Sequence, residues 1–171
     1  MTKNIAVIMT DLVEDIEYTS PKETMEQEGH KVDLISPEGK TVEGKKGGQF
    51  ESDHAIGDVS ASDYDALLIP GGFSPDSLRG DKEDRFGKFA AHFLENDKPV
   101  FAICHGPQLL VDTNLLKDRH VTSVKNVKND LINAGANWDD KALEVCGNLV
   151  TSRTPADLDE FNGEIKRQLA Q

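Results

Sequence analysis

The stretch that decides the fold is Val100-Phe101-Ala102-Ile103-Cys104-His105-Gly106-Pro107. Residues 99–103 form an apolar run typical of a buried strand, and residues 105–111 read as the helix that follows it. A strand that passes through one reactive residue directly into a helix has the layout of a nucleophile elbow. Here the cysteine takes the place of the serine in Gly-x-Ser-x-Gly. The stretch therefore predicts Cys104 at the carboxyl end of a core strand, with a strained backbone that exposes its side chain.

The same alternation of apolar runs and amphipathic stretches continues on both sides of this segment. Residues 5–9, 32–35 and 66–69 predict further buried strands, and residues 86–94 place apolar side chains on one face of a helix. Strands that alternate with helices indicate an α/β fold: a doubly wound, mostly parallel sheet of flavodoxin-like type with helices on both faces. At 171 residues, the chain is expected to form one domain, residues 1–171.

Several shorter patterns predict the remaining elements. Ser20, Pro21 and Glu23 resemble a capping box that starts a helix, and Gly29 ends it. Residues 40–59 are rich in glycine and charge, which favours a surface hairpin and loop. Residues 121–124 read as another strand, residues 143–145 and 149–151 as a hairpin, and residues 154–157 as the start of the last helix. That helix has an apolar stripe formed by Leu158, Phe161, Ile165 and Leu169.

The charge of the chain excludes several classes of partner. With 19 Lys and Arg against 31 Asp and Glu, the net charge is −12. Such a chain is a poor ligand for nucleic acid or for an anionic membrane surface. The longest uncharged stretch, residues 99–111, falls short of the ~20 residues of a spanning helix. The N-terminus lacks the pattern of a secretory signal, so we expect a cytoplasmic protein whose two cysteines are reduced thiols.

Three segments are expected to meet at the carboxyl ends of the strands, where such sheets place their ligands. The loop 11–17 is acidic, which argues against phosphate, flavin and dinucleotide, so no cofactor is expected. Glu14 and Glu17 share one face if the loop turns helically, and either can approach Cys104. A carboxyl group beside a thiolate should be protonated. The amides of Gly72 and His105 are candidates for an oxyanion hole, and Gly106 permits close backbone approach.

Each of these interpretations competes with a simpler one. Cys104 can be a buried structural thiol, the acidic residues can be solvated, and residues 70–72 can be a plain turn. A helix N-terminus after Cys104 is expected to lower the pKa of its thiol. We expect no metal at Cys104, His105 and Glu17, because adjacent elbow residues rarely supply converging ligands. The other thiol, Cys146, is expected to be inert, and the remaining histidines are expected to be solvated: His30, His54, His92 and His120.

A glutamine amidotransferase is disfavoured, because it needs a downstream His and Glu that residues 106–171 do not offer at a usable spacing. A phospho-receiver domain needs an aspartate after the third strand, where this chain has Pro70-Gly71-Gly72. The motifs instead resemble the ThiJ/PfpI superfamily, within its branch of PfpI-type intracellular proteases and general stress proteins. The resemblance covers nearly the whole chain and is carried by residues 14–17, 69–72, 102–110, 133–138 and 147–153.

The resemblance implies roles for individual residues. It implies Cys104 as the nucleophile, Glu17 as the protonated carboxyl bonded to it, and His105 as a base. In the protease-like branch an acidic residue from a neighbouring subunit orients the histidine, and the matching position here is Asp76. This implies a homodimer or a higher homo-oligomer. Two positions depart from the pattern: Asp76 is shorter than the Glu of some members, and Thr154 replaces a His.

The resemblance does not fix one activity, since members are described as peptidases, glyoxalases, deglycases, chaperones and redox sensors. The enzymatic readings share the attack of a cysteine thiolate on a carbonyl carbon. We expect a cytoplasmic stress-response protein that acts through Cys104 on a small aldehyde or a glycated adduct. The size of the chain favours a small carbonyl substrate over an extended peptide. The alternatives are a redox sensor or holdase without turnover, and a weak peptidase assembled across subunits.

Overall fold

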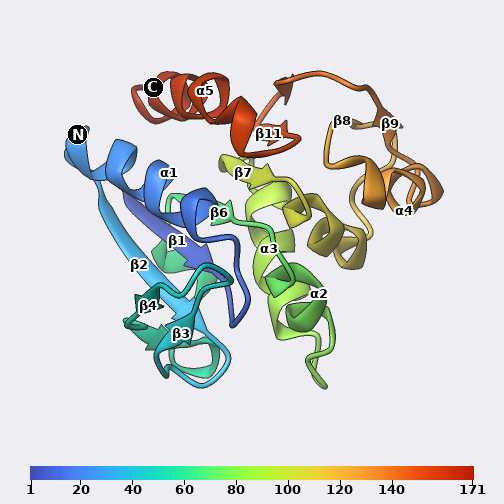
Figure 1. The fold of residues 1–171 in the computed structure, drawn as a ribbon. Coiled ribbons are helices and arrows are strands. Elements are labelled where there is room, and N and C mark those ends of the chain that lie inside the picture. The colour runs from blue at the N-terminus through green and yellow to red at the C-terminus, as the bar shows by residue number, and fades with distance from the viewer.

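The computed structural model describes all 171 residues and contains a seven-stranded sheet, in which only β10 runs antiparallel to its neighbour (Figure 1). Five core strands come from the predicted apolar runs and their neighbours: β1 (Asn4–Ile8), β2 (Lys31–Ser36), β6 (Ala66–Ile69), β7 (Val100–Ile103) and β11 (Leu149–Ser152). The sheet order is β10-β11-β7-β6-β1-β2-β5, with β10 (Glu144–Cys146) and β5 (His54–Ala55) at its edges.

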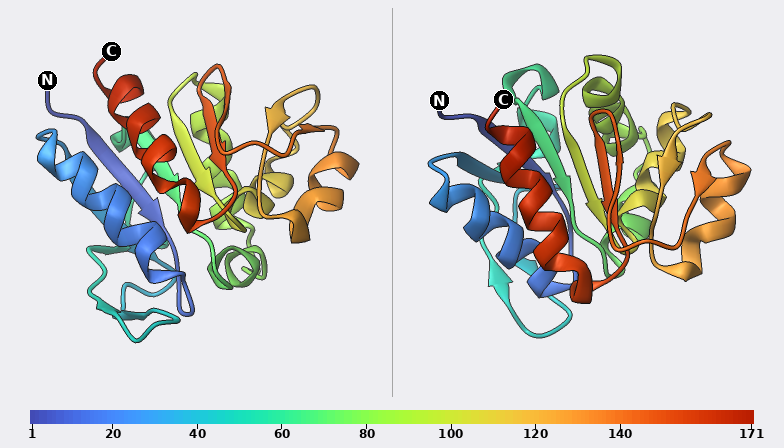
Figure 2. Two further views of the ribbon diagram at one scale, coloured as in Figure 1. Left: turned by 45° about the horizontal axis from the view of Figure 1, so that its top comes forward. Right: turned by 90° about the horizontal axis from the view of Figure 1, so that it is seen from above.

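Helices cover both faces of this sheet, which confirms the predicted α/β fold. On one face α1 (Asp15–Gln27) and α5 (Leu158–Leu169) lie side by side, as Figure 2 shows. The other face carries α2 (Ser74–Arg79), α3 (Arg85–Glu95), the 3₁₀ helix η3 (Gly106–Thr113) and α4 (Lys128–Asn133). Alternate side chains of each strand point to opposite faces of the sheet and pack into two separate hydrophobic cores. Phe101 packs with Phe161 of α5, whereas Val100 and Ala102 pack with the α3 side.

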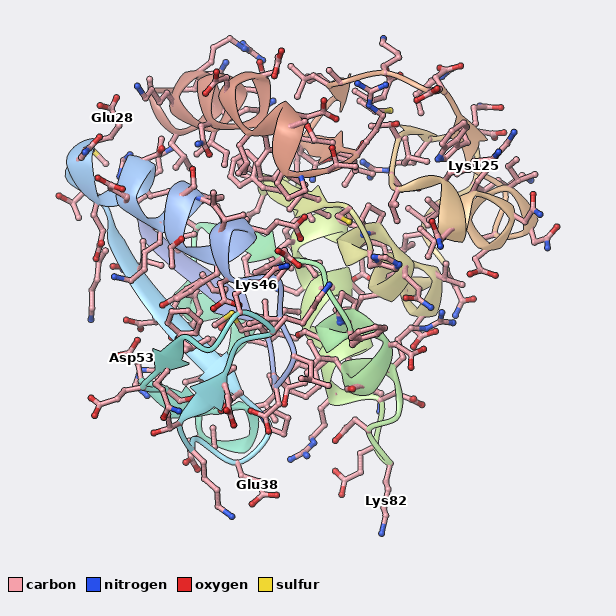
Figure 3. The ribbon with its side chains drawn as sticks, in the orientation of Figure 1. Glu28, Glu38, Lys46, Asp53, Lys82 and Lys125 are labelled. Atoms are coloured by element: carbon pink, nitrogen blue, oxygen red, sulfur yellow. The ribbon has the colours of Figure 1, made fainter.

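Smaller elements complete the chain. A hairpin joins β3 (Val42–Glu43) to β4 (Gln49–Phe50), and a parallel pair joins β8 (His120–Val121) to β9 (Asn137–Trp138). The remaining single turns of 3₁₀ helix are Ile56–Asp58, Ala61–Asp63, Lys125–Val127 and Pro155–Asp157. Charged side chains such as Glu28, Glu38 and Lys82 project outward from the periphery (Figure 3). None of the helices combines the length and the apolar character that crossing a bilayer requires.

Three predicted elements differ from the structure in their bounds, type or pairing. The first helix starts at Asp15 and encloses Pro21, because its acidic first turn suits a helix N-terminus and Ser20 uses its hydroxyl to accept a hydrogen bond from Asn162 of α5 (2.9 Å). The predicted helix after Cys104 is present as a 3₁₀ helix that runs two residues further, to Thr113. The strand expected at 121–124 is only His120–Val121 and lies outside the main sheet, because it pairs with β9. The predicted hairpin through Gly147, the stripe of α3 and the stripe of α5 are confirmed.

Candidate functional site

The carboxyl ends of β1, β6 and β7 lie next to one another in the sheet, where the chain reverses its order of winding. Such a switch point is the usual ligand site of an open α/β sheet. The segment after β1 leads into α1 and carries Glu17. The segment after β6 carries Gly71 and Gly72, and the end of β7 carries Cys104. The three segments that the sequence predicted to meet therefore share one edge.

The backbone at Cys104 has the strain that the elbow predicts, with φ at +63°. Its neighbours hold it in place from two sides. The Cys104 N–H donates to the Ser152 carbonyl (3.0 Å), and the Cys104 carbonyl accepts from the Val124 N–H (3.1 Å). Position 106 requires glycine, because a Cβ there would collide with the carbonyl oxygen of Ile69. The elbow is thus fixed by strand β11 and by the segment after β8.

Glu17 faces this elbow from the first turn of α1. Its side chain is fully buried, and its Oε1 accepts a hydrogen bond from the Gly71 N–H (2.8 Å). Burial raises the pKa of the carboxyl to about 8, and the nearby charge of Glu14 adds to this, against the opposing effect of the Gly71 bond. Glu17 is therefore protonated at neutral pH. The protonated carboxyl can donate a hydrogen bond to the Cys104 sulfur.

The thiol of Cys104 departs from the sequence prediction. Burial, followed by the charge that Glu17 carries once it ionises, raises its pKa to about 12, although the His105 amide lowers it. The expected depression of the thiol pKa was wrong, because the half-buried sulfur loses solvation beside a carboxyl group. Cys104 thus rests as a thiol and needs a base when it attacks.

His105 can be that base. Its Nδ1 lies 3.5 Å from the Cys104 sulfur. Burial, and to a smaller extent the charge of Lys45, lowers the pKa of the imidazole, so the ring is neutral at pH 7 and can accept a proton. Asp76 is exposed on α2 and makes no hydrogen bond to His105 within the protomer.

The two glycines after β6, Gly71 and Gly72, are required for different structural reasons. A Cβ at Gly71 would lie 2.6 Å from Glu17 Oε1 and 3.0 Å from Cys104 Cβ, so the position requires glycine. Gly72 has φ at +72° and forms a bridge with Val13. The N–H groups of Gly72 and His105 donate to no other backbone group. The His105 N–H is directed at the Cys104 sulfur, and the role of both amides as oxyanion donors stays a prediction.

Sequence reasoning missed the β3–β4 hairpin as a part of the site. Lys45 at its tip lies 3.1 Å from Glu14 Oε2 and 5.4 Å from the centre of the Phe73 ring. Asp15 holds the hairpin by accepting hydrogen bonds from the N–H groups of Lys46 (2.9 Å) and Gly48 (2.8 Å). The ion pair turns Glu14 toward the hairpin. The signal was the glycine-rich run 44–48 with its two lysines, which was predicted as a surface hairpin and loop with no role in the site.

Comparison with known proteins agrees with this geometry. The sequence profile of the DJ-1/PfpI family matches residues 3–168. The chain belongs to this family. A family relative from Bacillus subtilis (strain 168), named "Putative cysteine protease YraA", is 59% identical over 165 residues, which cover 96% of each chain. The family resemblance inferred from the motifs is confirmed.

Solved structures of DJ-1/PfpI domains show the same fold. A two-domain protein from Anabaena variabilis, with DJ-1/ThiJ/PfpI-like and ferritin-like domains, matches with a TM-score of 0.93 at 35% identity, over 98% of this chain and 48% of that one. A ThiJ/PfpI domain protein from Brachyspira murdochii matches with a TM-score of 0.92 at 28% identity, over 99% of this chain and 97% of that one. The flavodoxin-like arrangement is thus shared.

Proposed function

We propose that this chain is a cytoplasmic stress-response enzyme that uses Cys104 to attack the carbonyl carbon of a small aldehyde or a glycated adduct. The observation that carries the proposal is the buried carboxyl of Glu17, with its pKa raised to about 8, against a nucleophile elbow whose neighbouring imidazole is neutral. This set supplies a nucleophile, a base and an acid in one place, as carbonyl addition and proton transfer require.

The chemistry can be written for methylglyoxal. His105 takes the thiol proton as the Cys104 sulfur adds to the aldehyde carbon, and Glu17 protonates the resulting oxyanion. A base then moves the proton of that carbon to the neighbouring keto carbon, which oxidises the first carbon and reduces the second. The product is a lactoyl thioester on Cys104. Water hydrolyses it, which releases lactate and restores the thiol.

Two features support a small substrate. Cys104 and His105 are only partly exposed between three strand ends. A wide groove of about 950 Å³ exists elsewhere, between α2, α3 and η3, and its lining includes Asp76 and Arg79 but neither Cys104 nor His105. The protomer thus offers the sulfur a confined approach, which suits a compound of a few heavy atoms.

A peptidase assembled across subunits is the second candidate. The name of the Bacillus subtilis relative favours it. Three large apolar side chains are exposed beside the site: Leu12 (50%), Ile16 (47%) and Phe73 (59%). Such a patch supports association with a second copy of the chain, which is the arrangement that would bring an Asp76 to His105. A redox sensor is the third candidate, since a partly exposed Cys104 can oxidise and Glu17 can donate to its oxygens.

One experiment separates the three. Wild type, Cys104→Ser, Glu17→Gln, His105→Ala and Asp76→Ala are incubated with methylglyoxal and with a fluorogenic peptide at pH 7. We expect lactate formation that is lost in the first three variants. Peptide cleavage that is lost in Asp76→Ala, without aldehyde turnover, would establish the peptidase. Turnover of neither substrate, with clean oxidation of Cys104, would leave the sensor and refute the proposal.

A further inference from the structure

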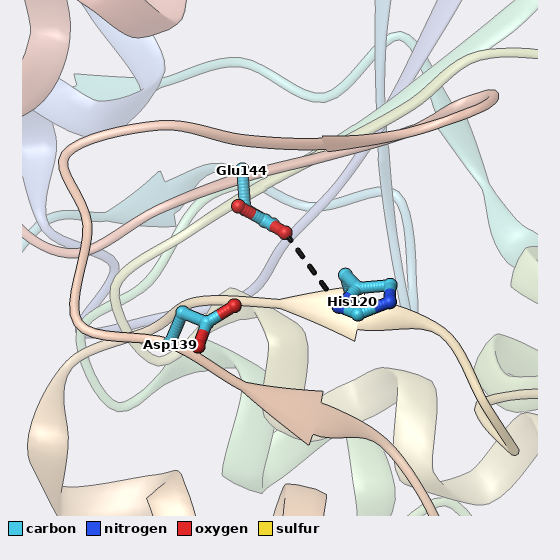
Figure 4. Close-up of side chains that lie close together, drawn as sticks. All are labelled: His120, Asp139 and Glu144. Carbon is cyan, nitrogen blue, oxygen red and sulfur yellow. Dashed lines mark ion pairs between the residues drawn. The ribbon is translucent and has the colours of Figure 1, made fainter.

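A second cluster of metal-binding side chains lies outside the Cys104 site. It consists of His120 on β8, Asp139 directly after β9, and Glu144 at the start of β10 (Figure 4). The side-chain ligand atoms of these residues all lie within 4.8 Å of one another. The three residues lie in or directly after three separate strands, so the fold rather than the local sequence brings them together.

Backbone bonds fix this arrangement. The His120 N–H donates to the Cys146 sulfur (3.4 Å), which ties β8 to β10. The Asp139 N–H donates to the Val121 carbonyl (3.0 Å), which extends the pairing of β9 with β8. Glu144 and Cys146 are two residues apart on β10 and therefore point to the same side. The cluster is thus held on rigid elements.

Glu144 is the member that points to a ligand. Its side chain is 8% exposed, and its Oε1 faces His120 Nδ1 at 4.0 Å and accepts no hydrogen bond, whereas its Oε2 is ion-paired with Lys141. A buried carboxylate normally requires several partners, because its charge loses the solvation of water. Lys141 Nζ lies 2.6 Å from Oε2, but the lysine side chain is 54% exposed and can swing into solvent. Its ammonium marks the position as one that attracts a cation.

The spacing within the cluster fits a metal ion. His120 Nδ1 and Glu144 Oε1 are 4.0 Å apart, which is too long for a hydrogen bond. Tetrahedral ligands at about 2.0–2.2 Å from one zinc ion lie about 3.3–3.6 Å apart, so the side chains must close in by up to about 1.5 Å to bind it. Asp139 is exposed and free to rotate the short remaining distance. One imidazole and two carboxylates suit Zn²⁺, whereas Mg²⁺ and Ca²⁺ prefer oxygen ligands alone.

We propose that His120, Asp139 and Glu144 bind one Zn²⁺ ion, which fastens the β8–β9 pair to the edge strand β10. Solvent completes the coordination, because the three side chains supply only three ligands. The ion displaces the ammonium of Lys141 from Glu144. This site is independent of the proposed reaction at Cys104, so either can be tested without the other.

The test is titration of the full chain with Zn²⁺ by calorimetry, with thermal unfolding as a second readout. A Cys104→Ser background removes the thiol of the elbow as an alternative zinc ligand, and Cys146 is retained because its sulfur accepts the His120 N–H. In that background we expect one Zn²⁺ per chain and a raised Tm, since a ligand of the folded state stabilises it. His120→Ala and Glu144→Gln should weaken binding by at least about tenfold. His120 is exposed, so its variant is expected to fold even if Glu144→Gln does not.

Two further variants sharpen the result. Lys141→Met removes the competing ammonium and should tighten zinc binding severalfold. His54→Ala is the matched control, because His54 lies beside a single carboxylate, Asp33 (3.3 Å), and should leave zinc binding unchanged. No zinc binding in the background chain, wild-type affinity in His120→Ala, or equal weakening in His54→Ala would each overturn the proposal.

Discussion

Glu17 and Glu144 are both buried, yet their surroundings differ in charge. Glu17 has no cation in contact. The charged side chain with the largest effect on its pKa is another acid, Glu14. Glu144 has an ammonium at 2.6 Å and an imidazole at 4.0 Å. The first environment favours a neutral carboxylic acid that donates a hydrogen bond. The second favours a carboxylate that binds a cation.

The comparison teaches that burial alone does not assign a role to a carboxyl group. Desolvation disfavours the charged form everywhere, and the sign of the neighbouring charge decides whether a proton or a cation compensates for it. In the elbow, the group that accompanies the carboxyl is a sulfur that becomes negative during attack. A proton on Glu17 stabilises that charge, whereas an ionised Glu17 would oppose it.

The largest expected effect distinguishes Glu17 from Glu164, a buried glutamate that is paired with an arginine. Glu17→Gln should lower aldehyde turnover by about 10²–10⁴-fold, because the amide cannot protonate the oxyanion. Glu164 is the matched control: its side chain is 9% exposed and paired with Arg167, far along α5. Glu164→Gln should leave turnover unchanged. Equal losses in both variants, measured as kcat/KM, would mean that Glu17 acts only through stability.

The second expected effect is on stability as a function of pH. The pKa of Glu17 rises from 4.5 to about 8 on folding, so between these values the folded chain holds a proton that the unfolded chain has released. Rising pH therefore favours unfolding over this window, by at most about 5 kcal/mol. Below pH 4.5 the contribution is fully present. Denaturant unfolding of wild type and Glu17→Gln should show this falling slope in wild type only.

The third effect concerns the close approach at the elbow. Gly71→Ala should destabilise the fold by about 1–3 kcal/mol, because the added methyl group meets Glu17 Oε1 and Cys104 Cβ. Gly163→Ala is the control, since a Cβ there meets no neighbouring atom and the residue lies within α5. Replacement of glycine by alanine in a helix is stabilising by up to about 1 kcal/mol. Similar stabilities of the two variants would contradict the packing at Gly71.

The smallest effect tests the hairpin cation. The charge of Lys45 lowers the pKa of both Glu17 and His105. Turnover requires a neutral His105 and a protonated Glu17, so its pH profile should rise through the first pKa and fall near pH 8 through the second. Lys45→Met should move both limbs to higher pH. A profile of kcat against pH that moves on one side only, or downward, would contradict this arrangement.

The Cys104 site was predictable because its residues directly follow strands that the apolar runs predict. The runs at 66–69 and 99–103 place Gly72 and Cys104 at one edge, and the acidic loop places Glu17 there too. What the sequence could not convey was the extent of burial, which reverses the expected pKa shift of the thiol. It also could not show that the Gly71 amide donates a hydrogen bond to Glu17.

The proposed zinc site was not predictable from the sequence. His120, Asp139 and Glu144 follow none of the spacings of a metal-binding motif, and β8 and β9 are two residues long. Their meeting depends on the tertiary pairing of β8 with β9 and β10. The start of α1 was mispredicted for a related reason. The hydroxyl of Ser20 serves a contact with Asn162, which lies 142 residues further along the chain.

The protonation state of Glu17 at neutral pH is the central claim, and the titration of its carboxyl carbon by ¹³C NMR tests it most directly. Glutamate labelled at the carboxyl carbon is incorporated into wild type, and the resonance absent from Glu17→Gln is assigned to Glu17. The structure predicts that this resonance titrates with a pKa of about 8. A Glu17 resonance that titrates near the ordinary glutamate pKa of about 4.3 would contradict the account.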